Sequence, residues 1–186
     1  MARKKLSIGA QFFKTFSNEN MIYVDKTETI YALMQQGVHN FIVRPRRFGK
    51  SLMLDTVAAL YEGRKEQFVG TWIYDKIDWN EIKRPTLRID FTEIEYDAFS
   101  LEQGIQNYLR PIAHELKIDT SGLGSRDLFR QIIQTLGKEK DIVILIDEYE
   151  MAVTDYVGVD EAKLEENIFT LKKSLEPKPS VSILSS

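Results

Sequence analysis

Apolar and polar positions along this chain follow two periods, one typical of strands and one typical of helices. Three segments predict strands: the nearly continuous apolar run Phe41–Val43, the alternating segment 85–94, and Ile142–Ile146, the most apolar stretch of the chain. Continuous apolar runs are expected where both faces of a strand are covered. We therefore expect the first and third strands to be covered on both faces, and the third to be central and parallel.

Helical spacing of apolar residues marks the intervening segments. Ser100 and Ser125 are predicted helix N-caps, and Pro111 is expected to kink or interrupt its helix. The aromatic segment 66–85 carries no regular period and is predicted to be a packed connection with turns. Strands that alternate with helices predict an α/β sandwich with a mostly parallel sheet. Helices are predicted over 27–36, 50–64, 101–116, 126–136 and 159–175.

A segment that resembles the end of a phosphate-binding loop lies between the first strand and the second predicted helix, and its strand–loop–helix context argues against a chance G-K-S. Gly49, Lys50 and Ser51 complete the pattern G-x-x-x-x-G-K-[ST], although Arg44 stands where the pattern has its first glycine. A strand leads in and a helix leads out, so backbone N–H groups of the loop and the helix N-terminus would point at a phosphate together. Lys50 would reach the β- and γ-phosphates, and the Ser51 hydroxyl would ligate Mg²⁺.

The entrance of this loop is rich in arginine. Pro45 fixes its own φ and biases Arg44 towards extended geometry, so a stiffer entrance is expected. Arg46 and Arg47 leave three interpretations open. They contact phosphate oxygens, which suits a guanidinium; they pair with carboxylates of neighbouring elements; or the basic loop binds nucleic acid.

Two adjacent acids follow the most apolar strand. Asp147 and Glu148 stand at its predicted carboxyl end, the edge where open α/β sheets bind ligands. Asp147 would act through Mg²⁺, and Glu148 would orient or deprotonate the attacking water. The alternative is a helix N-cap followed by a surface acid, and the upstream Gly49-Lys50-Ser51 argues against it.

Composition narrows the remaining choices. The 186 residues carry a net charge of −3, which excludes a general polyanion binder, and no cysteine is present, which excludes disulfides and thiolate sites. His39 and His114 are the only histidines and lie far apart in the sequence. A zinc site or a Ser-His-Asp triad is therefore not favoured. No run approaches the roughly 18 apolar residues of a membrane span, so a soluble cytoplasmic protein is expected.

Several ordered blocks of the chain resemble the bacterial AAA-ATPase-like family from about Phe12 to about Glu150. They are YVDKTETIYALM, FIVRPRRFGKSLMLDTVAALYEG, FVGTWIYD, PTLRIDFTEI and VILIDEYE. In that family the loop reads R-P-R-R-F-G-K-S/T, so the missing glycine is a family trait. The resemblance implies a P-loop NTPase-like three-layer sandwich that binds ATP with Mg²⁺. It also implies that Tyr23–Thr27 lies near the nucleotide, although capping preferences favour Asp25 as a helix N-cap.

The resemblance and the motifs together give a set of candidate residues. Lys50 and Glu148 are the candidate catalytic residues, and Ser51 and Asp147 the candidate metal ligands. The candidate nucleotide-binding residues are Arg46, Arg47, Phe48, Gly49, Lys50, Ser51 and Leu52.

The expected organisation is an N-terminal extension, 1–20, followed by a P-loop domain, 21–186, that is truncated at its C-terminus. Family members often carry a PD-(D/E)XK nuclease-like domain downstream, and residues 179–186 resemble the start of a further strand. Glu150 stands where the family tends to have aspartate. The predicted function is an ATP-binding P-loop module that acts as a Mg²⁺-dependent ATPase. The alternatives are a regulatory fragment that holds nucleotide without hydrolysis and a nucleic-acid-binding module.

Overall fold

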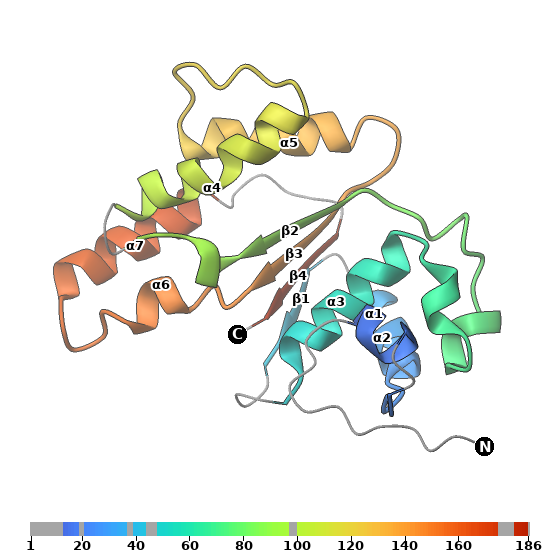
Figure 1. Cartoon of the computed structure of the whole chain (residues 1–186). Coiled ribbons are helices and arrows are strands. Elements are labelled where there is room, and N and C mark those ends of the chain that lie inside the picture. The colour runs from blue at the N-terminus through green and yellow to red at the C-terminus, as the bar shows by residue number, and fades with distance from the viewer. Residues whose placement is uncertain are drawn as a thin grey trace.

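A four-stranded parallel sheet organises the chain (Figure 1). The computed structural model describes residues 13–18, 21–36, 39–43, 48–96, 100–174 and 181–185. The strand order is β1-β4-β3-β2, so the strand that precedes the candidate loop is separated by one strand from the strand that carries the two acids. The strands are β1 (His39–Ile42), β2 (Thr86–Asp90), β3 (Val143–Asp147) and β4 (Val181–Ser185).

This topology agrees with the predicted α/β class and with the central, parallel position of β3. The strand predicted near the end of the chain is present as β4, between β1 and β3. The division of the chain at residue 20 stays a prediction.

Helices lie on both faces of the sheet, and each face has its own hydrophobic core (Figure 1). The helices α4, α5, α6 and α7 pack on one face, and α1, α2 and α3 pack on the other. The α-helices are α1 (Phe13–Asn18), α2 (Thr27–Met34), α3 (Lys50–Tyr61), α4 (Leu101–Glu115), α5 (Ser125–Leu136), α6 (Met151–Thr154) and α7 (Glu161–Ser174).

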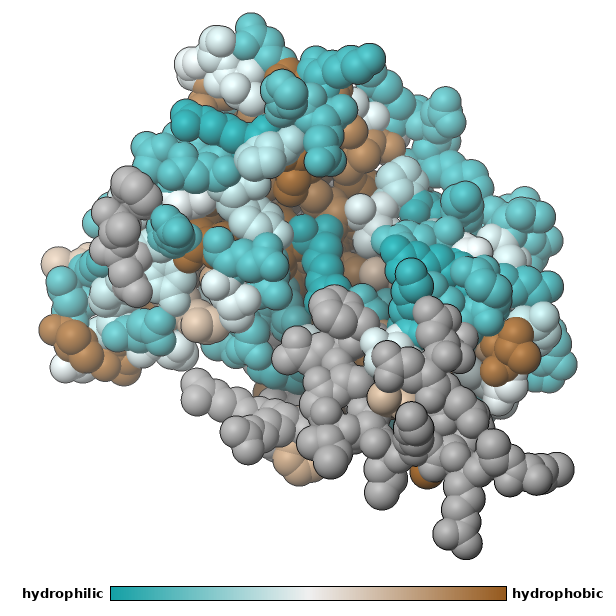
Figure 2. All heavy atoms as spheres, in the orientation of Figure 1, coloured by the Kyte–Doolittle hydropathy of each residue, from teal (hydrophilic) through white to brown (hydrophobic). Residues whose placement is uncertain are grey.

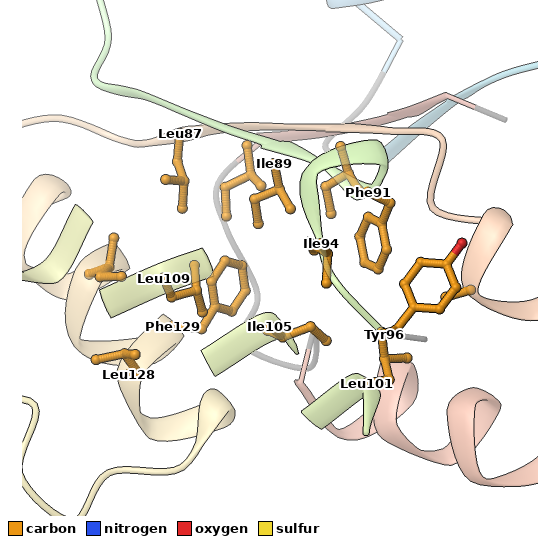
Figure 3. Close-up of a cluster of buried hydrophobic side chains, with 14 of the residues drawn as sticks. Leu87, Ile89, Phe91, Ile94, Tyr96, Leu101, Ile105, Leu109, Leu128 and Phe129 are labelled. Carbon is orange, nitrogen blue, oxygen red and sulfur yellow. The ribbon is translucent and has the colours of Figure 1, made fainter. Parts of the chain in front are cut away.

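Alternation along β3 supplies both cores. Val143 and Leu145 pack with α3, whereas Ile144 and Ile146 pack with α4 and α5. All five side chains of β3 are buried. Burial on both faces explains why its first four residues form a continuous apolar run. Figure 3 shows the α4–α5 core, where Leu87 and Ile89 of β2 face Leu109 of α4. The view in Figure 2 shows a mostly hydrophilic exterior, with hydrophobic residues visible mainly deep between these helices and the sheet.

The prediction that β1 is covered on both faces is wrong for the described residues. Asn40 and Ile42 are buried towards α3, but Phe41 is 62% exposed and Val43 is 79% exposed. The strand lies at the edge of the sheet described here, and α4 and α5 pack over β2 and β3. Apolar content alone does not reveal how far a helical layer extends across a sheet.

Local structure confirms one predicted helix cap and corrects three further expectations. Ser100 is an N-cap, and its Oγ accepts a hydrogen bond from Gln103 N at 3.3 Å. Ser125 is the first residue of α5 and not its cap: its N–H and Oγ–H both donate to Glu102, at 2.9 and 2.8 Å. Helix α4 continues through the exposed Pro111, so the expected interruption is wrong, whereas the expected kink stays a prediction.

The third correction concerns the segment predicted to lack regular structure. It contains the short 3₁₀ helices Lys65–Phe68 and Trp72–Asp75, and a third, Phe91–Glu93, follows β2. In the part of the chain that the structure describes, none of the helices is both long and apolar enough to cross a membrane.

Replacing Ile144 by alanine tests the core on the α4–α5 face. Because the side chain is 1% exposed, the substitution leaves a cavity, and we expect the free energy of unfolding to fall by about 2–5 kcal/mol. Urea denaturation followed by circular dichroism measures the change. Phe169→Ala is the control: its side chain is 67% exposed, so a change within about 0.5 kcal/mol is expected. Equal losses in the two variants would contradict the described core.

Candidate functional site

The chain leaves the carboxyl ends of β1 and β3 towards opposite faces of the sheet, and a polar cavity lies beside the end of β3. From β1 it passes to α3 on one face, and from β3 to α6 and α7 on the other. Ligands of open α/β sheets bind at such a point. The candidate site is built here from the first turn of α3 and the segment that follows β3.

The first turn of α3 places amide groups and a lysine next to the end of β3. Gly49 is the N-cap residue and has φ of 74°, a left-handed conformation that glycine adopts without strain. The first intrahelical bond runs from Met53 N to Gly49 O at 3.0 Å. The N–H groups of Lys50, Ser51 and Leu52 precede it, so the helix itself gives them no acceptor. This geometry favours an anion at the start of α3.

Lys50 lies against the acidic segment that follows β3. Its side chain is 7% exposed, and its Nζ lies 3.2 Å from Glu148 Oε1 and 3.6 Å from Glu150 Oε1. A buried ammonium needs such counter-charges, since an unpaired charge removed from water costs several kcal/mol. The sequence-predicted lysine and acid, 98 positions apart, are therefore direct neighbours.

Asp147 and Glu148 occupy different environments. Asp147 is 1% exposed, and its Oδ1 accepts a hydrogen bond from Glu148 N at 3.1 Å. Glu148 is partly exposed and has φ of 51°, a left-handed conformation that is uncommon for a residue with a side chain. Strained backbone of this kind is concentrated at functional sites. The left-handed conformation of Glu148 lies between the end of β3 and the turn that precedes α6.

Glu150 is the third acid at this position. Burial raises its pKa above the ordinary value of 4.5, and the negative charge of Glu148 adds to the rise, whereas its own backbone N–H and Lys50 oppose it. Its Oε2 is buried and has no hydrogen-bond partner among the described residues. Of the two carboxylate oxygens, Oε1 is therefore the one that faces Lys50.

The donor set beside α3 fits a magnesium ion. Ser51 supplies a hydroxyl and Asp147 a carboxylate, and both line one polar cavity together with Glu148. Among the described residues, no group of three or more acids or histidines is arranged to hold a metal ion by itself. Mg²⁺ needs no such group, because it commonly takes one or two protein ligands and completes its shell with water and phosphate oxygens.

Two cavities flank the first turn of α3. An apolar cavity of about 310 Å³ is lined by Tyr23, Val24, Phe48, Gly49 and Leu52, among others. A more polar cavity of about 500 Å³ is lined by Ser51, Asp147 and Glu148, together with residues of β2. Since Gly49 and Leu52 line the first cavity and Ser51 the second, the helix N-terminus stands between an apolar and a polar space.

The structure brings most of the predicted site residues together. Lys50, Ser51, Asp147 and Glu148 meet at the polar end, and the remaining described candidates line the apolar cavity. Arg46 and Arg47 lie outside the described residues, as does the arginine-rich entrance 44–47, so the interpretations of these arginines stay open.

Two residues contribute to the site that the sequence patterns do not predict there. Glu150 departs from the family pattern, and the structure places it next to Lys50. Arg88 lines the polar cavity, and its Nη1 lies 3.1 Å from Oδ1 of Asp55 in α3. The alternation of β2 held a signal: if Leu87 and Ile89 face α4 and α5, then Arg88 must face the α3 side.

Tyr23 and Val24 line the same cavity as Phe48 and Gly49, and the nearness of the segment Tyr23–Thr27 to a nucleotide stays a prediction. Asp25 has a structural role. Lys26 is the N-cap residue of α2, so the expected capping position is wrong by one residue. Asp25 Oδ1 accepts hydrogen bonds from Thr27 N at 2.8 Å and Thr27 Oγ1 at 2.7 Å, and Oδ2 accepts one from Trp72 N at 2.6 Å. Asp25 thereby joins the start of α2 to the 3₁₀ helix at Trp72.

Comparison with known proteins gives one family and one long relative. A family model described as "Predicted AAA-ATPase" matches residues 7–175. An uncharacterized protein in the vnfD 5′ region of Azotobacter chroococcum mcd 1 is 36% identical over 195 residues. That alignment covers 100% of this chain and 37% of the relative, so the chain spans little more than a third of the longer protein. No solved structure matches.

Replacing Asp25 by asparagine tests its structural role through pH. Burial alone would raise the pKa of Asp25, but the hydrogen bonds from Thr27 and Trp72 outweigh it and hold the pKa below the ordinary 3.8. Because the folded-state pKa is depressed, the stabilisation is present above pH 3.8 and is lost as the pH falls below that value. We expect Asp25→Asn to lower the free energy of unfolding by about 0.5–1 kcal/mol at pH 7.

Denaturation of both proteins between pH 2 and pH 7 measures this difference, which should shrink at the acid end of the range. Asp75→Asn is the matched control, since Asp75 is 74% exposed and pairs only with neighbouring Lys76 at 3.5 Å in the described contacts. A pH-independent difference for Asp25→Asn would show that its charge has no part in the effect.

Proposed function

Because this chain belongs to the AAA-ATPase-like family, we propose that it binds ATP together with Mg²⁺ at the first turn of α3 and hydrolyses it. The family supports a nucleotide-binding, ATPase-like role for the chain. The observation that carries the proposal is the contact of Lys50 with the acidic segment after β3, at 3.2 Å from Glu148. It unites the two halves of the predicted motif at the carboxyl edge of the sheet.

The triphosphate is proposed to lie across the N-terminus of α3. The N–H groups of Lys50, Ser51 and Leu52 are directed out of the first turn, where the helix dipole favours an anion. Lys50 would give the β- and γ-phosphate oxygens a mobile positive charge. Ser51 and Asp147 would hold Mg²⁺, which supplies further positive charge to the phosphates when it is bound.

The nucleobase is proposed to occupy the apolar cavity on the other side of this turn. A flat, mostly apolar base fits a space of about 310 Å³ that is lined by Tyr23, Val24 and Phe48. Gly49 lines the same cavity, so base and phosphates would be reached from consecutive residues of one loop. This arrangement gives the family segment Tyr23–Thr27 a place in the site: its apolar residues contact the base, while Asp25 holds the segment in position.

Hydrolysis requires a group that accepts a proton from water. Glu148 is the acid best suited to this role, because it is partly exposed, lines the polar cavity and is adjacent to the buried Asp147. In the proposed reaction a water oxygen bonds to the γ-phosphorus, and the bond to the β–γ bridging oxygen breaks. The water proton passes to Glu148, and ADP and phosphate leave.

Lys50→Ala tests nucleotide binding. Loss of a charge-assisted contact to phosphate should weaken binding of a Mg²⁺-bound fluorescent ATP analogue by about 10- to 100-fold. Fluorescence titration measures the affinity, and circular dichroism checks that the variant is folded. The control is Lys138→Ala, which should bind the analogue like the wild-type protein. Lys138 is exposed and precedes β3, so it lies at the opposite end of the sheet. Equal affinity of a folded Lys50→Ala variant would refute the proposed site.

Glu148→Gln separates binding from hydrolysis. The amide keeps the size of the side chain but cannot accept the proton, so turnover should fall by about 10²- to 10⁴-fold while the ATP analogue still binds. Phosphate release under saturating ATP measures turnover. Glu165→Gln, the same change at an exposed position of α7, should leave it unaltered. Tight binding by the wild-type protein without phosphate release would favour the alternative, a regulatory module that holds nucleotide.

A further inference from the structure

Around Lys50 there are more acids than one lysine can neutralise. Glu148 and Glu150 both approach its Nζ, at 3.2 and 3.6 Å, and Asp147 lies beside them in sequence. In the proposed hydrolysis Asp147 would hold Mg²⁺ and Glu148 would accept the proton from water. Glu150 therefore occupies a position next to the phosphate-binding lysine for which the proposed reaction gives no reason.

The contacts of Glu150 make it a competitor for Lys50. Its Oε1 faces the ammonium, and its Oε2 is buried without a hydrogen-bond partner among the described residues. Its backbone carbonyl is fixed by the first turn of α6, accepting from Val153 N at 3.0 Å and Thr154 N at 2.8 Å. The side chain thus extends from a fixed point and interacts with the lysine through one oxygen.

Phosphate oxygens would need the same ammonium. A triphosphate bound at α3 would take Lys50 as its counter-charge and would bring its own negative charge next to Glu148 and Glu150. Like charges at such a distance repel, and a half-buried position screens them less than open solvent. Phosphate binding would therefore weaken the contacts of Lys50 with the two glutamates.

We propose that Glu150 is a positioning residue that holds Lys50 in the nucleotide-free protein and gives it up to the phosphates of the bound nucleotide. The inference rests on the proposed function and adds a regulation of the same site. Since Glu148 shares the lysine, the same displacement frees Glu148 to face the water. Glu150 thus links occupation of the phosphate site to exposure of the catalytic acid.

This role predicts that Glu150 lowers the affinity for a triphosphate. Part of the binding free energy is used to break the contacts of Lys50 with the glutamates. This cost reduces the apparent affinity of the protein for the triphosphate. Glu150→Gln removes the competing charge with little change of size. We expect a Mg²⁺-bound, non-hydrolysable ATP analogue to bind about fivefold more tightly, the size expected for one partly exposed ion pair.

The experiment compares three proteins and two ligands by calorimetric titration. Wild type, Glu150→Gln and Glu165→Gln are titrated with the ATP analogue and with AMP, which lacks the β- and γ-phosphates. Only the combination of Glu150→Gln and the triphosphate should show tighter binding. The Glu165→Gln control makes the same change in net charge on an exposed part of α7, so it measures the general electrostatic effect.

Each result decides between the inferences. Unchanged or weaker triphosphate binding by folded Glu150→Gln overturns the role of Glu150, and so does an equal gain for AMP. If the wild-type protein and both variants fail to bind the triphosphate at all, the proposed function fails with it. If Glu150→Gln does not fold, Glu150→Asp takes its place: its carboxylate is one methylene further from Lys50, and a smaller gain in triphosphate affinity is expected.

Discussion

Strand β3 carries side chains that are all buried, with exposed fractions from 0% to 3%, so both of its faces need apolar partners. Val143 and Leu145 obtain theirs from α3, and Ile144 and Ile146 obtain theirs from α4 and α5. This requirement places helices on both sides of the sheet and sends the chain to opposite faces after β1 and β3. The candidate site lies at these strand ends, so its position follows from how the core is filled.

Charge balance governs which groups can pair with Lys50 at the candidate site. Lys50 is too deeply buried to be left without a counter-ion, and in the described structure the acids after β3 provide it. The same ammonium is proposed to serve a triphosphate, so the protein has two alternative partners for one buried charge. An exchange between them would connect ligand binding to the freedom of Glu148, whose left-handed backbone already holds it at the edge of the polar cavity.

The segments with strong periodicity were predictable, and the failures have identifiable physical causes. Helix α3 and strand β3 follow from continuous local patterns, and the Gly49-Lys50-Ser51 motif with Asp147 follows from the order of strand, loop and helix. The exposure of Phe41 was not predictable, because it depends on how far the layer of α4 and α5 extends across the sheet. The role of Ser125 at the start of α5 was not predictable, because its N–H donates to Glu102, a residue of another helix.

The sequence by itself determined the α/β class, the parallel arrangement expected for an apolar strand such as β3, and the types of residue available for phosphate and metal chemistry. These properties depend on neighbours along the chain, through hydrophobic period and backbone preference. Only the tertiary structure decided that Glu150 contacts Lys50, that Asp25 binds the backbone of Trp72, and that Arg88 approaches Asp55. Such contacts join residues tens of positions apart, so they depend on the packing of whole elements and not on any local pattern.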